Sequence, residues 1–268
     1  MKKSIIIFSA VIATLSLLAF GFMNSKDSET GRVETSGIEN VALNKQVVEP
    51  SIGPNFPDFF YDVGSRFNVI KKGDLDKATS FSDFIGEAHV NRIVSYKSLS
   101  VIILDGDKQT DKKETGNDGT LTAAQVKLLQ SLAYSTNLLI RADYREKNIE
   151  TGQIEDSYWT PYLTIVPETQ AVYAGGKKGL ITYLKENSKK NIVIVQEDKL
   201  RPANLFFTVT KKGVIENVKL DGTSGYPSID KTMIELIKTL PEAWEPARNS
   251  NGELVNQELV FSFGNRGC

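Results

Sequence analysis

The residues that most often carry catalysis or bind metals are scarce in this chain. His89 is the single histidine and Cys268 the single cysteine among 268 residues. Nucleophilic triads usually use a histidine as general base, and a structural zinc site needs about four nitrogen or sulfur ligands. Because His89 stands between Ala88 and Val90 in a segment with helical periodicity, we interpret it as a structural or surface histidine. The sequence therefore predicts no catalytic residue, no metal site and no cofactor.

An acidic segment from Asp105 to Asp118 offers the carboxylates of a calcium loop, but its spacing does not fit one. The sixth position of a helix-loop-helix calcium loop requires Gly, and Thr110 stands there. Interleaved lysines also offset the negative charge of the segment; they are Lys108, Lys112 and Lys113. We therefore expect a solvated connection between two elements.

Two further patterns are typical of ligand sites, and we interpret both as structural. The segment Gly175–Gly179 lacks the glycine spacing of the phosphate-binding motifs, so we expect a loop that leads into a helix. Tyr158-Trp159 near Arg141 could stack on nucleic-acid bases, but such interleaving more often marks a half-buried sheet face. The net charge is −1, from 32 basic and 33 acidic side chains. Without a positive field, we expect no nucleic-acid partner.

The first residues have the pattern of an export signal. Lys2 and Lys3 precede the uncharged run Ser4 to Ser25, which contains two apolar clusters. Ala19-Phe20-Gly21 offers a small-x-small cleavage site, so residues 1–23 have the features of a signal peptide. Counted as residues 5–23, the same run approaches the ~20 residues that span a bilayer, and anchoring in the inner membrane is the equal alternative.

Either fate of the N-terminus places the rest of the chain in the periplasm, as a protein secreted into the cell envelope or anchored at the inner membrane. Residues 24–57 are rich in Ser, Glu, Asn and Gly without periodicity, which predicts a flexible linker. This linker is too short to cross a wide compartment. Membrane contact is expected only through the N-terminal segment, if that segment is not cleaved.

Residues 58–166 are predicted to form an α+β domain of unknown role. Thr122 and Gln125 form a capping box for a helix over Ala123–Leu132. A second helix is predicted over Phe81–Val94 from its apolar spacing. The predicted strands are Val101–Leu104, Leu138–Ala142 and Tyr162–Val166.

Residues 167–268 are predicted to form a second small domain in series with the first. Leu180, Tyr183 and Leu184 have the spacing of one helix face. A hairpin, a helix capped by Ser228 and ended by Pro241, and a last strand follow; the strands are Leu205–Thr210, Val214–Leu220 and Leu254–Phe263. The fold class expected for the whole chain is therefore α+β.

Several residues of this second domain recur in a known order. They are Gly213 in the hairpin turn, Ser224-Gly225, Asp230 at the start of the helix, and Trp244-Glu245-Pro246-Ala247 before the last strand. This pattern resembles the C-terminal domain of the TonB energy-transducer family, over about Pro167 to Phe263. The resemblance implies a β-β-α-β module in which Gly213, Ser224, Gly225, Asp230, Trp244, Pro246 and Ala247 maintain the fold.

The resemblance also implies a function. In that family the final strand lies at a sheet edge and pairs with an extended peptide of an outer-membrane receptor, which is recognition by strand addition. The matching positions are Gln257, Glu258, Leu259, Val260, Phe261, Ser262 and Phe263. Either the odd-numbered or the even-numbered side chains would face outward, and the sequence leaves both open. We expect a non-catalytic envelope protein that binds such a receptor or another envelope protein in connection with transmembrane transport.

Two departures from the family limit this expectation. Family transducers couple to an inner-membrane motor through a polar motif with a histidine in the membrane segment, and they carry a long proline-rich spacer. Here the membrane segment has only Ser9, Thr14 and Ser16 as polar residues, and the spacer is absent. Transmission of force is therefore not expected. The alternative function is an exported sensor or small-ligand-binding protein whose activity lies in residues 58–166.

Overall fold

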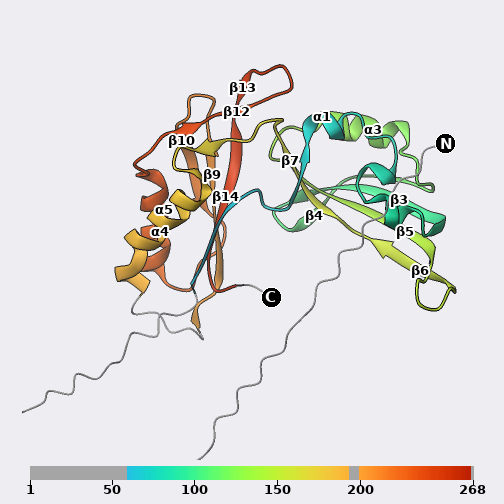
Figure 1. The fold of residues 1–268 in the computed structure, drawn as a ribbon, viewed down its shortest axis with the longest axis horizontal. Coiled ribbons are helices and arrows are strands. Elements are labelled where there is room, and N and C mark those ends of the chain that lie inside the picture. Colours follow the sequence, from blue (N-terminus) through green and yellow to red (C-terminus); the bar gives the residue numbers. More distant parts are fainter. Residues whose placement is uncertain (1–58, 193–198, 267–268) are drawn as a thin grey trace, which may run out of the picture. The chain divides into compact units, whose positions relative to one another are not determined.

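The computed structural model describes residues 59–192 and 199–266. These described residues belong to one compact unit. The unit is mixed α+β, mostly sheet with five α-helices in the described ranges (Figure 1), which confirms the predicted fold class. The export segment, the linker and Cys268 lie outside the described residues. No helix within the described ranges is both long and apolar enough to cross a membrane.

A six-stranded sheet carries the first hydrophobic core. Its strand order is β2-β7-β5-β3-β4, and β6 pairs with the other part of β5. β2 runs parallel to β7, whereas the remaining neighbours are antiparallel. The strands are β2 (Asn68–Lys71), β3 (Ile93–Asp105), β4 (Lys108–Gly116), β5 (Asn137–Lys147), β6 (Ile154–Trp159) and β7 (Tyr162–Val166).

Three short helices and one 3₁₀ turn accompany this sheet. They are α1 (Lys72–Leu75), the 3₁₀ turn Phe81–Asp83, α2 (Glu87–Val90) and α3 (Ala123–Gln130). The capping box at α3 is confirmed: the Thr122 hydroxyl accepts from the Gln125 amide at 3.2 Å, and Gln125 Oε1 accepts from the Thr122 amide at 2.8 Å. The local signal was strong enough to define this helix without tertiary context.

The helix predicted over Phe81–Val94 is wrong as one element. Ser80 and Asp83 form a capping box around the 3₁₀ turn. Gly86 then has extended backbone, with ψ of 147°, and separates this turn from α2. The long strand β3 begins at Ile93, so its pairing with β5 prevails over the local helical spacing.

The solvated connection expected over Asp105–Asp118 is also wrong, because most of it is strand β4. β3 and β4 form an antiparallel hairpin whose turn contains Gly106 at a φ of +61°. β4 lies at the edge of the sheet, and nearly all of its side chains are exposed. Charged side chains are a common way to keep an edge strand from pairing with another molecule, which explains a strand that lacks an apolar pattern.

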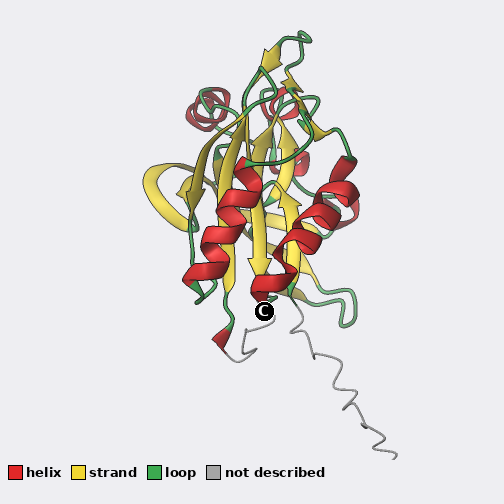
Figure 2. Cartoon of the chain, turned by 90° about the vertical axis from the view of Figure 1, so that its left-hand side faces the viewer, coloured by secondary structure: helices red, strands yellow, loops and turns green. Residues whose placement is uncertain are grey.

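A four-stranded antiparallel sheet carries the second core, with the order β1-β14-β9-β10. Helices α4 and α5 cover one face of it (Figure 2). Two short ladders, β8 with β11 and β12 with β13, lie beside the sheet. The elements are β1 (Phe60–Gly64), β8 (Val172–Tyr173), α4 (Gly176–Ile192), β9 (Pro202–Val209), β10 (Ile215–Leu220), α5 (Pro227–Lys238), β11 (Trp244–Glu245), β12 (Ala247–Arg248), β13 (Leu254–Val255) and β14 (Gln257–Gly264).

The expected β9–β10 hairpin is confirmed, and two details after it differ from expectation. Ser228 does not cap α5; the helix begins with Pro227 at its first turn, after Tyr226. Proline suits that position because the first amides of a helix have no internal partner. The last strand is divided at Asn256, whose side chain accepts from the Lys211 amide at 2.8 Å.

Alternate residues of the strands face the two helices. Leu205 and Phe207 of β9 and Phe261 and Phe263 of β14 pack in one buried cluster with the apolar stripe of α5, Ile229, Met233 and Ile237. The strand period of two and the helical period of 3.6 both place their apolar residues in this core. The second core is therefore built from residues far apart in the sequence.

The expectation that the final strand forms a sheet edge is wrong for Val260–Gly264, which lie between β9 and β1, whereas Gln257–Leu259 extend past the end of β1. β1 pairs with β14 over its full length, from Phe60 opposite Gly264 to Gly64 opposite Val260. Tyr61 and Val63 face the helices and extend the apolar face of β14, which explains why β1 takes this place. The edges of the sheet are consequently β1 and β10, and residues that precede the predicted boundary at Pro167 belong to the C-terminal sheet.

A candidate binding site at the end of strand β1

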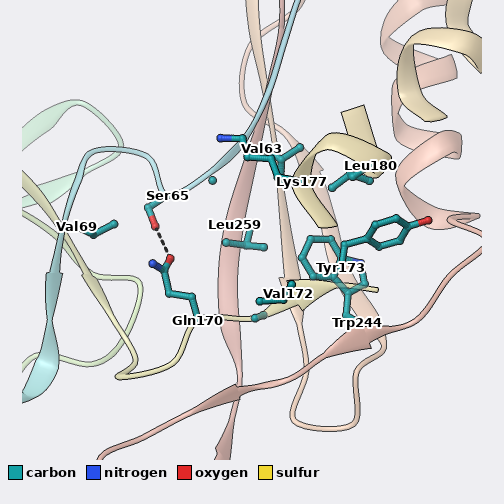
Figure 3. A pocket seen from close by; sticks show the side chains of 12 residues that line it. Val63, Ser65, Val69, Gln170, Val172, Tyr173, Lys177, Leu180, Trp244 and Leu259 are labelled. Carbon is teal, nitrogen blue, oxygen red and sulfur yellow. Dashed lines mark hydrogen bonds between the residues drawn. The ribbon is translucent and has the colours of Figure 1, made fainter. Parts of the chain in front are cut away.

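A pocket of about 380 Å³ opens where β1 ends (Figure 3). Its volume is in the range of sites that hold a small ligand or a few side-chain atoms. The apolar part of its lining comes from six elements and from the residue just before β8: Val63, Val69, Ala171, Val172, Tyr173, Leu180, Trp244 and Leu259. The polar part is Ser65, Gln170 and Lys177.

The inner wall of the pocket belongs to the core between the sheet and the helices. Val63, Leu180 and Leu259 are buried there. At the same pocket, Val172 is 47% exposed and Val69 is 53% exposed. A half-exposed apolar rim over a buried apolar wall can cover an apolar group from a ligand.

Trp244 forms part of this wall, and its buried indole N–H makes no hydrogen bond to the described residues. Its ring lies 5.6 Å from that of Tyr173 and 5.7 Å from that of Phe207. An unmade bond of a buried donor costs about 1–3 kcal/mol, so the packing at this end of the core is incomplete.

Two polar residues of the pocket, Lys177 and Ser65, contact polar neighbours. Lys177 Nζ lies 2.6 Å from Asp62 Oδ1 at the surface, and the Ser65 hydroxyl donates to Gln170 at 3.5 Å. Both members of the ion pair are more than 40% exposed, so the pair contributes little stability. These groups form the polar rim of the pocket.

Strand β14 fixes the segment that forms the opposite wall. Gln257 is 1% exposed. Its Oε1 accepts from the Ala171 amide at 2.7 Å, and its Nε2 donates to Gln170 Oε1 at 3.1 Å. The amide of Gln257 thereby positions the residues just before β8.

Arg66 anchors the chain directly after the pocket. Its guanidinium lies 2.9 Å from Asp107 and 3.1 Å from Asp221, and it stacks 5.1 Å from the ring of Phe206. The Arg66 side chain is 9% exposed. Burial alone would lower the pKa of Arg66, but hydrogen bonds to the two carboxylates outweigh it and raise the pKa. The turn between β1 and β2 is therefore held by a charged and largely buried side chain.

Tyr61 fastens β1 to helix α4. The Ser188 hydroxyl donates to the Leu184 carbonyl at 2.7 Å, so its oxygen accepts from the Tyr61 hydroxyl at 2.6 Å. Burial raises the pKa of Tyr61 to about 12, against a smaller opposing effect of the Ser188 hydroxyl. The protonated phenol is thus the form that suits this position.

The residues expected to bind a partner strand lie in β14, and those from Val260 to Phe263 lie between β9 and β1. Leu259, Phe261 and Phe263 face the helices and are buried. Glu258, Val260 and Ser262 alternate with them and take the opposite face of the sheet. Val260 is also buried, and the Ser262 hydroxyl donates to Asn204 at 2.8 Å. Val260–Gly264 pair with β9 on one side and with β1 on the other, whereas Gln257–Leu259 pair with β9 alone. On its other side the Glu258 amide donates to the Ser135 hydroxyl at 2.9 Å.

The residues expected to maintain the fold lie in two groups. Gly213 has a φ of +74°, and a side chain there would collide with the Trp244 carbonyl and approach Pro246. Asp230 is buried and accepts from the Ser224 amide at 3.0 Å and from the Thr223 hydroxyl at 2.5 Å. Gly225 has a φ of +87°, and Ala247 is fully buried in β12.

His89 lies in α2, away from the pocket residues. Its Nε2 contacts the Tyr144 hydroxyl, and its Nδ1 lies 3.0 Å from Arg92. Burial lowers the pKa of His89, Arg92 lowers it further, and Glu146 opposes both. These contacts are those of a structural histidine. Within the described ranges, no group of three or more His, Cys, Asp or Glu is placed to hold a metal ion.

The pocket itself was not found from the sequence. Its walls come from β1, β2, β8, α4, β11 and β14, which no local pattern brings together. The alternation of Phe59, Tyr61 and Val63 was the one available signal for β1. No family model, curated protein or solved structure matches the chain.

Proposed function

We propose that the chain is a non-catalytic protein of the cell envelope that binds a protein partner by strand addition to its C-terminal sheet. Its partner is an extended segment of an envelope protein, of which a TonB-dependent outer-membrane receptor is the example that the family resemblance supplies. The proposal includes the export of the chain to the periplasm, either cleaved or anchored by residues 5–23. The β-β-α-β order of β9, β10, α5 and β14 agrees with the TonB-like module.

The observation that carries the proposal is the open edge of β1 beside the pocket. β14 is the only strand that pairs with β1 in the described part of the chain. The backbone groups on the other side of β1 are therefore available to an incoming strand. The apolar pocket adjoins this edge at Val63, Gly64 and Ser65. A row of backbone groups next to an apolar pocket is the usual composition of a strand-addition site.

Addition beside β1 is favoured over replacement of β1. Replacement would expose Val63, which is 6% exposed, and would separate Tyr61 from Ser188 and Phe261. Loss of this burial costs on the order of 3 kcal/mol or more. A competing strand would then bind about 100-fold more weakly than a strand that adds to an intact sheet.

The opposite edge of the sheet is less suited to a partner. The pairing of β10 with β9 shifts between Glu216 and Lys219, and Asn217 has a φ of +54°. Such a bulge disturbs the regular row of backbone groups that strand addition needs. We therefore assign the partner to the β1 edge.

Site-specific photocrosslinking in the native cell envelope tests this assignment. A photoreactive benzoylphenylalanine is placed in turn at Asp62 on β1, at Val172 on the pocket rim, and at Glu216 on β10. All three positions are exposed enough for the substitution to be tolerated. We expect a common crosslinked partner from the first two positions and none from Glu216. Crosslinks from Glu216 alone, or none from β1 and the rim, would contradict the proposal.

A second candidate function lies in residues 58–166. Tyr158 is 62% exposed, Trp159 is 43% exposed and Ile154 is 47% exposed, all on β6. Ile154 and Tyr158 share one face of β6, and Trp159 takes the other face, where its ring lies 5.0 Å from that of His89. The exposed pair Ile154 and Tyr158 favours the alternative in which the first sheet is the binding module. The same photoreactive residue at Tyr158 separates the two candidates, because a crosslink from there without one from Asp62 would favour the first sheet.

A further inference from the structure

We infer that the pocket at the end of β1 receives one large apolar side chain of the partner strand, at the position that pairs with Val63. This inference rests on the proposed addition of a strand to β1 and adds the side chain that the site selects. Nothing in the family resemblance assigns a ligand to these residues. The occupant is an extended peptide segment with a residue the size of phenylalanine or leucine.

The position follows from the pleat of the sheet. Val63 faces the helices, and it forms one wall of the pocket. Directly opposed residues on neighbouring strands have Cβ atoms about 5 Å apart on the same face of the sheet. A residue that pairs with Val63 from the outer edge therefore directs its side chain to the same side as Val63, where the pocket lies.

The chemistry of the occupant follows from the lining. The inner wall is formed by Leu180, Leu259 and the rings of Tyr173 and Trp244, without a charged group among them. The one charged residue that lines the pocket, Lys177, is already paired with Asp62 at the surface. An apolar side chain would remove water from the half-exposed Val69 and Val172. A charged side chain would lose its hydration without gaining a partner, so the pocket disfavours it.

The two tryptophans of the chain allow binding of an apolar side chain in the pocket to be tested without a known partner. Trp159 and Trp244 give two indole N–H signals in a ¹H–¹⁵N spectrum, and a Trp159→Phe variant assigns them. The probes are N-acetyl-L-phenylalaninamide and, as a matched control without the side chain, N-acetylglycinamide. From the efficiency typical of small ligands, the first should bind with a Kd on the order of 1 mM. We expect it to shift the Trp244 signal and leave that of Trp159 in place.

A pair of variants locates the effect. Val172→Asp introduces a charge at the pocket rim, whereas Val214→Asp makes the same change at a position 53% exposed in the β9–β10 hairpin. We expect at least a tenfold loss of probe binding in V172D and no loss in V214D. A Trp244 signal that does not respond, an equal response to N-acetylglycinamide, or equal effects of the two variants would overturn the inference.

This experiment is separable from the test of strand addition. A single capped amino acid cannot form a strand, so it reports on the pocket and not on the β1 edge. If the probe binds but no crosslink forms from Asp62 or Val172, the pocket selects apolar groups and the proposed function fails. If the crosslinks form but the probe does not bind, strand addition stands and the inference about the pocket fails.

Discussion

The ring of Tyr61 in β1 stacks on the ring of Phe261 in β14, with centroids 6.2 Å apart and an angle of 20° between the planes. This contact joins a residue near the start of the described chain to one near its end. It places β1 in the apolar core of the C-terminal sheet, where β1 covers the edge of β14 from Val260 to Gly264. A strand that approaches this side of the sheet therefore contacts β1, and the Tyr61 contact contributes to the stability of the pairing between β1 and β14.

Val63→Ala is expected to lower the free energy of unfolding by about 1–3 kcal/mol, because it removes buried methyl groups next to Phe261. Val63 is 6% exposed. Val94→Ala is the matched control, since Val94 is 55% exposed. Urea unfolding of the three proteins measures the difference. Equal and small losses in the two variants would show that β1 does not contribute to the core.

Tyr61 should make stability depend on pH in the alkaline range. Its pKa in the folded chain is about 12, above the ordinary value of 10.0, so its contribution is complete below pH 10.0 and is lost as the pH rises toward 12. Tyr61→Phe cannot ionise and lacks this loss. The difference in unfolding free energy between wild type and Y61F should therefore change over this interval. A constant difference would show that the Tyr61 phenol is not buried against Ser188.

Arg66→Ala should destabilise the turn between β1 and β2, by about 1–3 kcal/mol, because Asp107 and Asp221 lose their shared partner. Arg66→Lys keeps the charge but cannot bond both carboxylates in one plane, and we expect an intermediate loss. Chemical denaturation ranks the three proteins. Full retention of stability in R66K would mean that charge alone, without the planar fork, holds this turn.

Local signals in the sequence predicted several elements and failed for others in a consistent way. The α3 helix has its complete capping box at Thr122 and Gln125, and β7 is a short apolar run before Pro167. β4 has no apolar alternation, because its charged side chains serve an edge strand. The pairing of β1 with β14 joins distant segments, and no local pattern carries that information.

In the candidate site, too, local motifs are recognisable in the sequence, whereas contacts between distant segments are not. Trp244, Gly213 and Asp230 fit a sequence motif, and in the structure they make contacts that support the fold. The pocket beside them depends on Val63, Val172 and Leu180, which are ordinary apolar residues in the sequence. These residues form a pocket only because the fold brings them together at the end of β1, and the sequence carries no local pattern for that arrangement.

The central claim is that a partner adds to β1 while β1 stays paired with β14. Asp62 and Ser262 are opposed in the two strands, and antiparallel neighbours lie within disulfide range. A chain with Asp62→Cys, Ser262→Cys and Cys268→Ser can therefore be locked by oxidation and released by a reductant. Ser100→Cys with Thr115→Cys, opposed in β3 and β4, is the control lock.

The decisive measurement is the yield of partner crosslinked from a photoreactive residue at Val172, in the locked and in the reduced chain. We predict equal yields in the two states, because addition to β1 does not require β1 to move. A yield that falls on locking, returns on reduction and is unaffected by the control lock would show that the partner replaces β1, and would contradict the account.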